Sequence, residues 1–297
     1  MINKGANKMK RLSLLLAGAT IFAGICVHAE ESKNLVVNGN AADGSDYWRC
    51  SHDDTSIPIE VIAGGPDGAN CFEVTGHAWV FNTEHIPVDS NSEYRLTGWF
   101  KSGNDKANQV KLGLLLFDEN KRSIDSTSVY VLEGSETVLA AEAQNGGTII
   151  KVKDASTWEP LFQKKQLTVA FDADDSGEYT DLPNRNCYAV TGLEEKNGAW
   201  EVTLAKPISA DFVAGTKVRA HRTSIHYTYA FEIKDHLAEW TEGSGVISPM
   251  VKSGAPQNAF WPGTKYVQIL ILANWQQKSG EVVQFGKISL EKVGPAK

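Results

Sequence analysis

Two almost uninterrupted apolar runs, GLLLF at residues 113–117 and ILILA at residues 269–273, lie far apart in the chain. Both are short and bounded by turn-forming residues, a pattern typical of central strands that are buried on both faces. Each run belongs to a strand-rich segment, one at residues 34–139 and the other at residues 224–293. We therefore expect these two segments to form two halves of one β-sandwich.

Further runs rich in β-branched and aromatic residues support this fold class, and no segment shows a sustained helical period. The runs in the two segments are EYRLTGWF, VKLGLLLF, VYVLEG, YTYAFEI, KYVQILILA and VVQFGKISLEKV. Clusters of Gly, Asn, Asp and Ser separate them. Short strands at regular spacing favour a sandwich or jelly roll. The sequence predicts an all-β protein built on a jelly-roll β-sandwich.

The middle of the chain has a different character. It contains about five or six short strand patterns, enough for a small β-barrel or β-roll, and Lys196-Asn197-Gly198 is a strong hairpin signal. A surface loop tolerates an insertion when its ends lie close together. We therefore predict a small inserted β domain at residues 140–222, within a discontinuous sandwich of residues 30–139 and 223–297.

The N-terminus has the pattern of a signal peptide at residues 1–29. A basic start precedes the apolar run LSLLLAGATIFAGIC, and Val27-His28-Ala29 supplies small residues for cleavage after Ala29. The run is short for a membrane span of roughly 20 residues, and the rest of the chain offers no apolar stretch that would span a membrane. We expect a secreted, periplasmic or cell-surface protein. A lipoprotein attached through Cys26 is the alternative, although Ile25 replaces the usual small residue.

The expected mature chain is acidic. It carries 25 basic and 36 acidic residues, a net charge of −11, because the signal segment holds four basic residues and no acidic one. Such a surface repels phosphate backbones, so we do not expect nucleic acid as a partner.

Three cysteines remain after cleavage, and export permits disulfides. Cys50 and Cys71 flank a predicted pair of strands, so we predict a disulfide between them, with a geometry that the sequence does not fix. Cys187 is left over and is interpreted as a small buried apolar residue rather than a reactive thiol.

Both outer segments resemble the CenC-like, galactose-binding-like jelly-roll carbohydrate-binding modules. The similarity lies in four stretches: NLVVNGNAADGSDYW, GANCFEVTG, HIPVDSNSEYRLTGWFKSG and the closing FWPGTKYVQILILANWQQKSGEVVQFGKISLEKV. The middle segment resembles short β modules of phage and bacterial surface proteins. The first resemblance implies a jelly roll that binds polysaccharide or another glycan without catalysis.

The same resemblance raises the question of a structural calcium ion. Modules of this kind often hold one with an acidic pair in the last strand, where this chain has Gly286 and Lys287. A lysine does not ligate a hard cation, which takes oxygen ligands. Asp43 and Asp46 remain as candidate ligands together with backbone carbonyls. Calcium is therefore left open, and no other cofactor is expected.

Aromatic residues are the best candidates for a binding site. Sugar rings present apolar C–H faces that stack on exposed aromatic rings, while nearby polar groups bond the hydroxyls. Our candidates are Trp79, Trp240, Trp261 and Trp275, with Gln276 as a polar neighbour. The alternative for each Trp is core packing, because Trp is highly buried on average.

No catalytic constellation is visible in the sequence. A glycosidase needs two carboxylates at a set separation, and the adjacent acidic pairs of this chain would point to opposite faces of a strand. The stretch DADDSGEYTD partly imitates a calcium loop, but Pro183 stands where a bidentate Glu is needed, so we interpret it as a solvated turn.

We predict a secreted, non-catalytic protein that binds glycan. One alternative is an extracellular structural or adhesion subunit that presents the insert to a protein partner. The second alternative is an enzyme that acts on polysaccharide, with a site assembled from distant strands.

Overall fold

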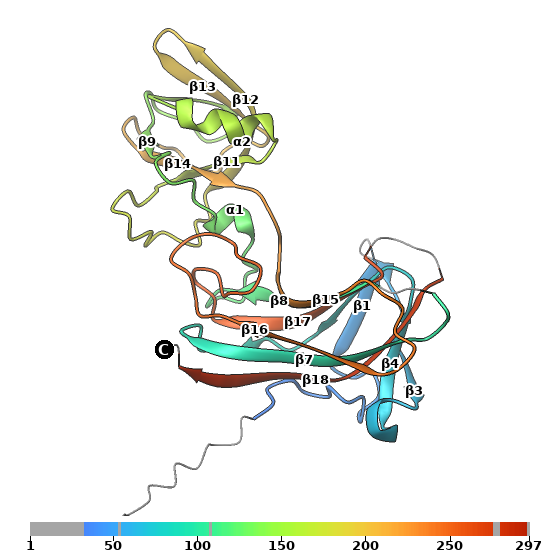
Figure 1. The fold of residues 1–297 in the computed structure, drawn as a ribbon. Coiled ribbons are helices and arrows are strands. Elements are labelled where there is room, and N and C mark those ends of the chain that lie inside the picture. The colour runs from blue at the N-terminus through green and yellow to red at the C-terminus, as the bar shows by residue number, and fades with distance from the viewer. Residues whose placement is uncertain (1–32, 53–54, 107–108, 276–279, 296–297) are drawn as a thin grey trace, which may run out of the picture. The chain divides into compact units, whose positions relative to one another are not determined.

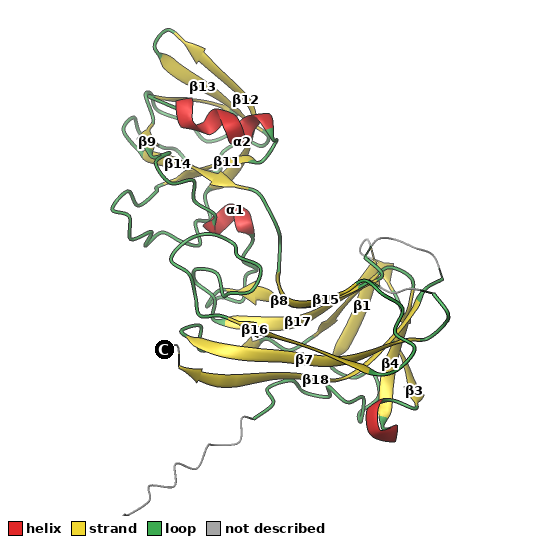
Figure 2. Ribbon diagram, in the orientation of Figure 1, coloured by secondary structure: helices red, strands yellow, loops and turns green. Residues whose placement is uncertain are grey.

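The described part of the chain folds into strands joined by turns and loops, with helices of at most five residues (Figures 1 and 2). The computed structural model describes residues 33–52, 55–106, 109–275 and 280–295. The predicted signal segment at residues 1–29 lies outside these ranges. Within them, no helix is long and apolar enough to cross a membrane.

The first sheet, here called sheet A, has seven antiparallel strands. Its order is β15-β8-β17-β5-β1-β2, and β6 pairs with β17. The strands are β1 (Trp48–His52), β2 (Thr55–Ser56), β5 (Ala78–Asn82), β6 (Ile86–Pro87), β8 (Val110–Phe117), β15 (Thr228–Ile233) and β17 (Tyr266–Ala273). The two apolar runs of the sequence are β8 and β17, which lie side by side with Leu270 opposite Gly113. Seven of the eight β17 residues are buried, as expected for a central strand.

The second sheet, sheet B, has five antiparallel strands in the order β16-β7-β18-β4-β3. They are β3 (Glu60–Ala63), β4 (Asn70–Thr75), β7 (Ser92–Ser102), β16 (Thr241–Ile247) and β18 (Val282–Pro295). Alternate residues of both sheets form one apolar core, with Val80 and Ile271 from sheet A and Phe72 and Phe285 from sheet B. The predicted all-β class and jelly-roll β-sandwich are confirmed.

A third sheet of six strands is built from residues between the two halves of the sandwich. Its order is β10-β13-β12-β11-β14-β9. The elements are β9 (Thr137–Val138), β10 (Ile149–Val152), α2 (Glu159–Gln163), β11 (Leu167–Phe171), β12 (Cys187–Lys196), β13 (Ala199–Leu204) and β14 (Lys217–Arg222). Its apolar side chains, among them Trp158 and Phe171, form a second core. The division into a discontinuous sandwich and a separate inserted domain stays a prediction.

One predicted strand is wrong. VYVLEG does not form a strand, because helix α1 (Ser126–Val129) ends inside it and Val131 makes only an isolated bridge to His221. The cause lies just upstream, where the Asp125 side chain accepts a hydrogen bond from the Thr127 N–H and caps the helix. Local capping thus outweighs the β propensity of the valines that follow.

Candidate functional site

The outward face of sheet A carries a concentration of aromatic side chains. Successive residues of a strand point to opposite faces. Since Ala78 and Val80 of β5 enter the core, Trp79 and Phe81 point outward. In the register of the sheet, Trp79 lies opposite Leu272 of β17, and Leu272 lies opposite Lys111 of β8. Three strands distant in the sequence therefore contribute to one surface, which we call the aromatic face.

Four rings form the first cluster on this face, called the Trp79 cluster: Trp79, Tyr227, Tyr229 and Trp275. The ring centroids of Trp79 and Tyr227 are 5.9 Å apart with the planes nearly perpendicular, and those of Tyr227 and Tyr229 are 6.2 Å apart. Lys111 links the cluster, because its Nζ lies 4.7 Å from the Tyr229 centroid and 4.4 Å from that of Trp275. All four rings are half-buried and thus keep part of their surface accessible.

Besides the two rings, the Glu232 carboxylate also contacts the Lys111 ammonium group. Lys111 Nζ lies 3.7 Å from Glu232 Oε1. Glu232 Oε2 forms a second ion pair, with Lys234 Nζ at 3.4 Å. A cation over the face of a ring is attracted by the ring quadrupole, by about 0.5–1 kcal/mol at an exposed site. Lys111 therefore orders two rings of the cluster and provides a polar group beside them.

A second aromatic cluster, called the Tyr266 cluster, lies at the other end of β17 and comprises His85, Phe117 and Tyr266. The His85 centroid is 4.5 Å from that of Phe117 and 6.5 Å from that of Tyr266. Lys121 Nζ lies 5.5 Å from the Tyr266 centroid. Tyr266 precedes Leu272 by six residues on β17, so the two clusters are separated by roughly 20 Å along the strand.

Between the clusters, β17 contributes one polar and two apolar side chains to this face. The outward residues of β17 there are Gln268, Leu270 and Leu272, all buried. Gly113 lies next to Leu270 and has no side chain. A Cβ at Gly113 would come within 2.1 Å of the Thr228 carbonyl oxygen, so the close pairing of β8 with β15 requires glycine. The aromatic rings thus stand at both ends of a stretch of β17 whose own outward side chains are buried.

A hollow of about 590 Å³ adjoins the face at the β1–β2 edge of sheet A. Arg49, Ser51, Ser56 and Phe81 are among its lining residues. Arg49 lies opposite Phe81 in the sheet, and its side chain is exposed. Hydrogen-bonding groups therefore lie next to the aromatic rings on this side.

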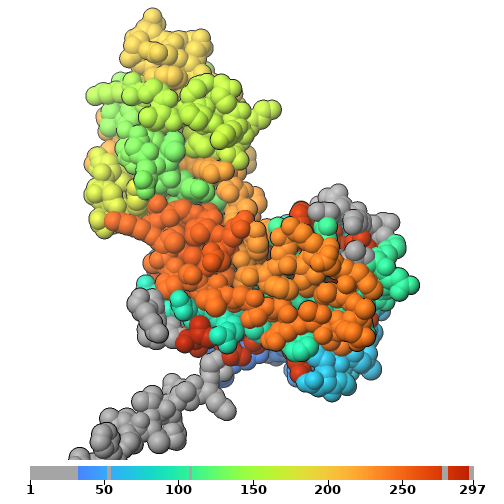
Figure 3. Space-filling model, viewed as in Figure 1, coloured from blue at the N-terminus to red at the C-terminus, as the bar shows by residue number. Residues whose placement is uncertain are grey.

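The structure brings together two of the predicted binding residues, Trp79 and Trp275. Trp240 lies elsewhere, just before β16 of sheet B, and its Nε1 donates to the Gly64 carbonyl at 2.9 Å. Figure 3 shows the orange surface that includes this part of the chain against the blue surface of the early strands. Gln276 lies outside the described residues.

The prediction for Trp261 is wrong. Its side chain is 0% exposed, belongs to the sandwich core, and donates from Nε1 to the Pro256 carbonyl at 2.8 Å. A ring without accessible surface does not stack on a ligand. The loop between β16 and β17 places Trp261 in the core. The local sequence FWPGT does not indicate this direction of the side chain.

Sequence reasoning missed Tyr227, Tyr229, Lys111 and Tyr266. The signal for the first two was present, because tyrosines two residues apart in a strand point to the same face. Their neighbours on the face come from other strands, and no sequence pattern fixes that pairing.

Asp43 and Asp46 lie in a turn that is organised by the side chain of Asn38. Asn38 Nδ2 donates to the carbonyls of Gly44 (3.0 Å) and Asp46 (2.8 Å), and Asn38 Oδ1 accepts from the Asp43 N–H (3.0 Å). The two Asp side chains themselves are exposed. In the described ranges, no three His, Cys, Asp or Glu side chains gather as a metal-binding group.

The predicted disulfide between Cys50 and Cys71 is not formed, and both residues are free, buried cysteines. Cys50 lies on β1 of sheet A and enters the core. Cys71 lies on β4 of sheet B, where its neighbours Phe72 and Val74 enter the core, so Cys71 points to the opposite face. A disulfide requires two cysteines whose Cβ atoms point toward each other, and Cys71 points away from the core that Cys50 enters. Burial raises the pKa of the Cys50 thiol to about 11.

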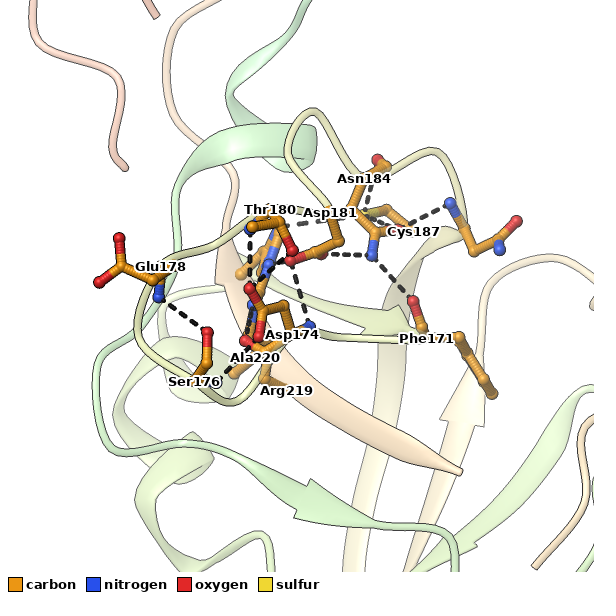
Figure 4. A network of polar contacts seen from close by, with 12 residues as sticks. Phe171, Asp174, Ser176, Glu178, Thr180, Asp181, Asn184, Cys187, Arg219 and Ala220 are labelled. Carbon is orange, nitrogen blue, oxygen red and sulfur yellow. Dashed lines mark hydrogen bonds and ion pairs between the residues drawn. The ribbon is translucent and has the colours of Figure 1, made fainter. Parts of the chain in front are cut away.

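A second polar arrangement, the Arg219 network, lies in the third sheet and holds the DADDSGEYTD turn (Figure 4). The Arg219 side chain is 0% exposed and uses all three of its nitrogen atoms. Nη2 donates to Asp181 Oδ2 (2.7 Å), Nη1 to the Asp174 carbonyl (2.8 Å) and Nε to His221 Nε2 (2.9 Å). Asp181 Oδ2 also accepts Asn184 Nδ2 at 2.8 Å.

The Asp174 carboxylate closes the turn through hydrogen bonds. It accepts the backbone N–H groups of Ser176 (2.9 Å) and Thr180 (2.8 Å), as well as the Thr180 hydroxyl. These hydrogen bonds, first of all the one from the Thr180 N–H, lower the Asp174 pKa well below its usual range. The sequence predicts a solvated turn. In the structure, Asp174 and Arg219 hold the backbone of this turn through hydrogen bonds.

The network also brings Cys187 Sγ within 3.9 Å of His221 Nδ1. Because His221 Nε2 accepts a hydrogen bond from the Arg219 Nε–H, the ring hydrogen is on Nδ1, which donates to the Thr127 carbonyl at 2.7 Å. Burial and the Arg219 charge lower the His221 pKa to about 4, and burial raises the Cys187 pKa to about 12. A neutral thiol beside a histidine without a free base position is a structural pair, not an activated nucleophile.

No protein-family model matches the chain, and no curated protein matches it. Solved structures are similar only in backbone arrangement. The CBM22-1–GH10 modules of Clostridium thermocellum endo-1,4-β-D-xylanase 10B, complexed with xylohexaose, are 9% identical with a TM-score of 0.37, covering 90% of this chain and 28% of that one. A family 16 carbohydrate-binding module-2 is 14% identical with a TM-score of 0.34, covering 86% and 99%.

A third similar structure is TmCBM61 in complex with β-1,4-galactotriose, 10% identical with a TM-score of 0.33, covering 88% of this chain and 99% of that one. This chain therefore spans less than a third of the xylanase structure but almost the full length of the two isolated modules. At these scores the likeness carries no information on the ligand of this chain.

Proposed function

We propose that this protein is a secreted, non-catalytic, glycan-binding protein and that the aromatic face of sheet A is its binding site. The observation that carries the proposal is the pair of aromatic clusters at the two ends of β17, separated by roughly 20 Å along the strand. An extended oligosaccharide has the matching shape, since its sugar rings stack on aromatic rings at intervals along one line.

Polar groups beside the rings suit sugar hydroxyls. Arg49 donates from the β1–β2 edge, Lys111 donates beside the Trp79 cluster, and Glu232 accepts next to Lys111. Glu232 is paired with two lysines and not with a second carboxylate, whereas glycoside hydrolysis uses two carboxyl groups across the scissile bond. The geometry therefore supports binding better than hydrolysis.

The test is affinity electrophoresis of residues 30–297 against neutral and acidic polysaccharides, with Trp79→Ala compared to Trp240→Ala. Both variants lose one indole. Trp240 lies just before β16 of sheet B, so its substitution leaves the aromatic face intact. We expect Trp79→Ala to weaken binding by about tenfold or more, since stacked aromatic residues at a binding centre contribute more than 1 kcal/mol.

Circular dichroism of each variant shows first that it folds. Retardation by no polysaccharide, or equal retardation of wild type and Trp79→Ala, contradicts the proposal. New reducing ends during incubation would favour the polysaccharide-active enzyme instead. Loss of binding with chelator would show that calcium is required.

The main alternative is an extracellular structural or adhesion subunit. Two apolar side chains among residues 137–222 are well exposed, Ile149 at 55% and Val213 at 74%. Exposed apolar groups favour contact with a protein partner when they form a patch. The electrophoresis separates the two functions, because a subunit of this kind would not be retarded by glycan.

A further inference from the structure

The Tyr266 cluster continues into a polar hollow of about 300 Å³ whose lining includes Asp118, Arg122, Arg185 and Lys265. The connection is direct in the chain, because Asp118 follows Phe117 and Lys265 precedes Tyr266. The two loops are also hydrogen-bonded to each other, with the Lys265 N–H donating to the Phe117 carbonyl at 2.9 Å. We call this hollow, together with Lys121, the basic end of the aromatic face.

The one buried carboxylate of the basic end, Asp118, is fully used by the protein. Its Oδ2 accepts Arg122 Nε (3.2 Å) and Arg185 Nη2 (2.5 Å), and its Oδ1 accepts the backbone N–H groups of Asn120 and Arg122. Burial acts to raise the Asp118 pKa, but these hydrogen bonds outweigh it and the pKa is lowered. Asp118 therefore stays ionised and neutralises one of the surrounding cations.

Positive charge is left over after this pairing. The hollow is lined by Arg122, Arg185 and Lys265 against Asp118 and Glu119, and Lys121 lies over Tyr266 beside it. In the described part of the chain, neither Lys121 nor Lys265 has an ion-pair partner. The Arg122 side chain is 59% exposed and only its Nε contacts Asp118, so its Nη groups face outward. The chain as a whole has a net charge of −7, so this local excess of positive charge is opposite in sign to the charge of the whole protein.

We propose that the basic end binds an anionic substituent of the glycan, a carboxylate or a sulfate ester, while the sugar rings lie along the aromatic face. This inference rests on the proposed function and narrows its ligand to an acidic polysaccharide. Guanidinium and ammonium groups are the side chains that recognise carboxylate and sulfate oxygens. The neighbouring Tyr266 and Phe117 rings supply the stacking surface for the sugar that carries the charge.

Matched polymers test the charge requirement with wild-type protein. One pair is polygalacturonic acid and its methyl ester, which differ only in the carboxylate. The other is sulfated carrageenan and the same polymer after chemical desulfation. We expect stronger retardation by the charged member of at least one pair, with a difference that shrinks as salt is raised. The pair that responds tells carboxylate from sulfate.

A double variant tests the location. Lys121→Gln with Lys265→Gln removes the two unpaired ammonium groups, and Lys153→Gln with Lys164→Gln is the control with the same change in net charge at exposed sites elsewhere. We expect about fivefold weaker binding of the charged polymer for the first variant and no change for the control. Binding of the uncharged polymer should not change in either.

The outcomes separate the two levels of the proposal. Equal binding of both members of each pair, or an unaffected double variant, overturns the anionic ligand and leaves glycan binding intact. Equal weakening by the control variant shows an effect of net charge alone and also overturns the basic end. Failure of every polymer to bind contradicts the proposed function itself.

Discussion

At the scale of single residues, Arg219 shows how this fold accommodates a fully buried charge. A guanidinium with 0% exposure needs polar partners in the interior, and here each of its three nitrogen atoms has one, in Asp181, Asp174 and His221. Breaking a buried pair by removing one partner costs about 3–5 kcal/mol, whereas an exposed pair contributes at most about 1 kcal/mol.

The same turn supplies a matched test of this difference. We expect Asp181→Asn to lower the free energy of unfolding by about 3 kcal/mol, because the Arg219 charge stays buried without its counterion. Asp175→Asn should cost less than about 1 kcal/mol, since Asp175 and its partner Lys217 are both about half exposed. Urea titration at pH 7 measures both. Equal losses would show that burial is not what matters.

At the scale of elements, the aromatic face depends on how closely β15 approaches β8. The two strands pair across Gly113, and a bulge between Tyr229 and Phe231 shifts the register there. This bulge lets Tyr229 point outward while Phe231 packs against the core. The position of the tyrosines on the face therefore follows from backbone geometry as much as from their own chemistry.

Gly113→Ala tests this dependence. Its Cβ would meet the Thr228 carbonyl at 2.1 Å, so β15 must move, and we expect a loss of about 1–3 kcal/mol in stability together with weaker glycan retardation. Gly286→Ala in β18 is the control, because its Cβ meets nothing closer than 3.6 Å. That change should stay within about 0.5 kcal/mol. An unaltered Gly113→Ala protein would mean that β15 is not tightly held.

At the scale of the whole molecule, apolar burial holds the described chain together without cross-links. One core lies between sheets A and B, and a second lies within the third sheet. Cys50, Cys71 and Cys187 are all free. The turn around Asn38, where Asp43 and Asp46 lie, is closed by amide hydrogen bonds.

We therefore expect the midpoint of thermal unfolding of residues 30–297 to be unchanged by dithiothreitol and by EDTA. A disulfide contributing about 3 kcal/mol would show itself as a fall of roughly 6 °C or more on reduction. A fall with EDTA that added calcium reverses would establish the structural calcium that the sequence leaves open. Differential scanning calorimetry with each additive measures both effects.

The chemistry of the candidate site could be expected from the sequence, but its position in the fold only in part. Trp79 and Trp275 were identified from the chemistry of aromatic residues, and the structure places both on one face. Trp261 was selected by the same reasoning and is buried. The sequence shows which aromatic residues are available for stacking on a ligand. Whether such a residue points to the outer face or into the core depends on strand register and on the direction of the adjoining loop.

The sequence by itself determined the β architecture. Alternation, turn residues and two apolar runs specify strands and their buried faces through local geometry, which needs no knowledge of distant partners. The tertiary structure alone decided which strands became neighbours. Cys50 and Cys71 were separated onto two sheets, and Trp79, Tyr229 and Lys111 were joined on one, because pairing between segments far apart in the chain is fixed by the packing of the whole core.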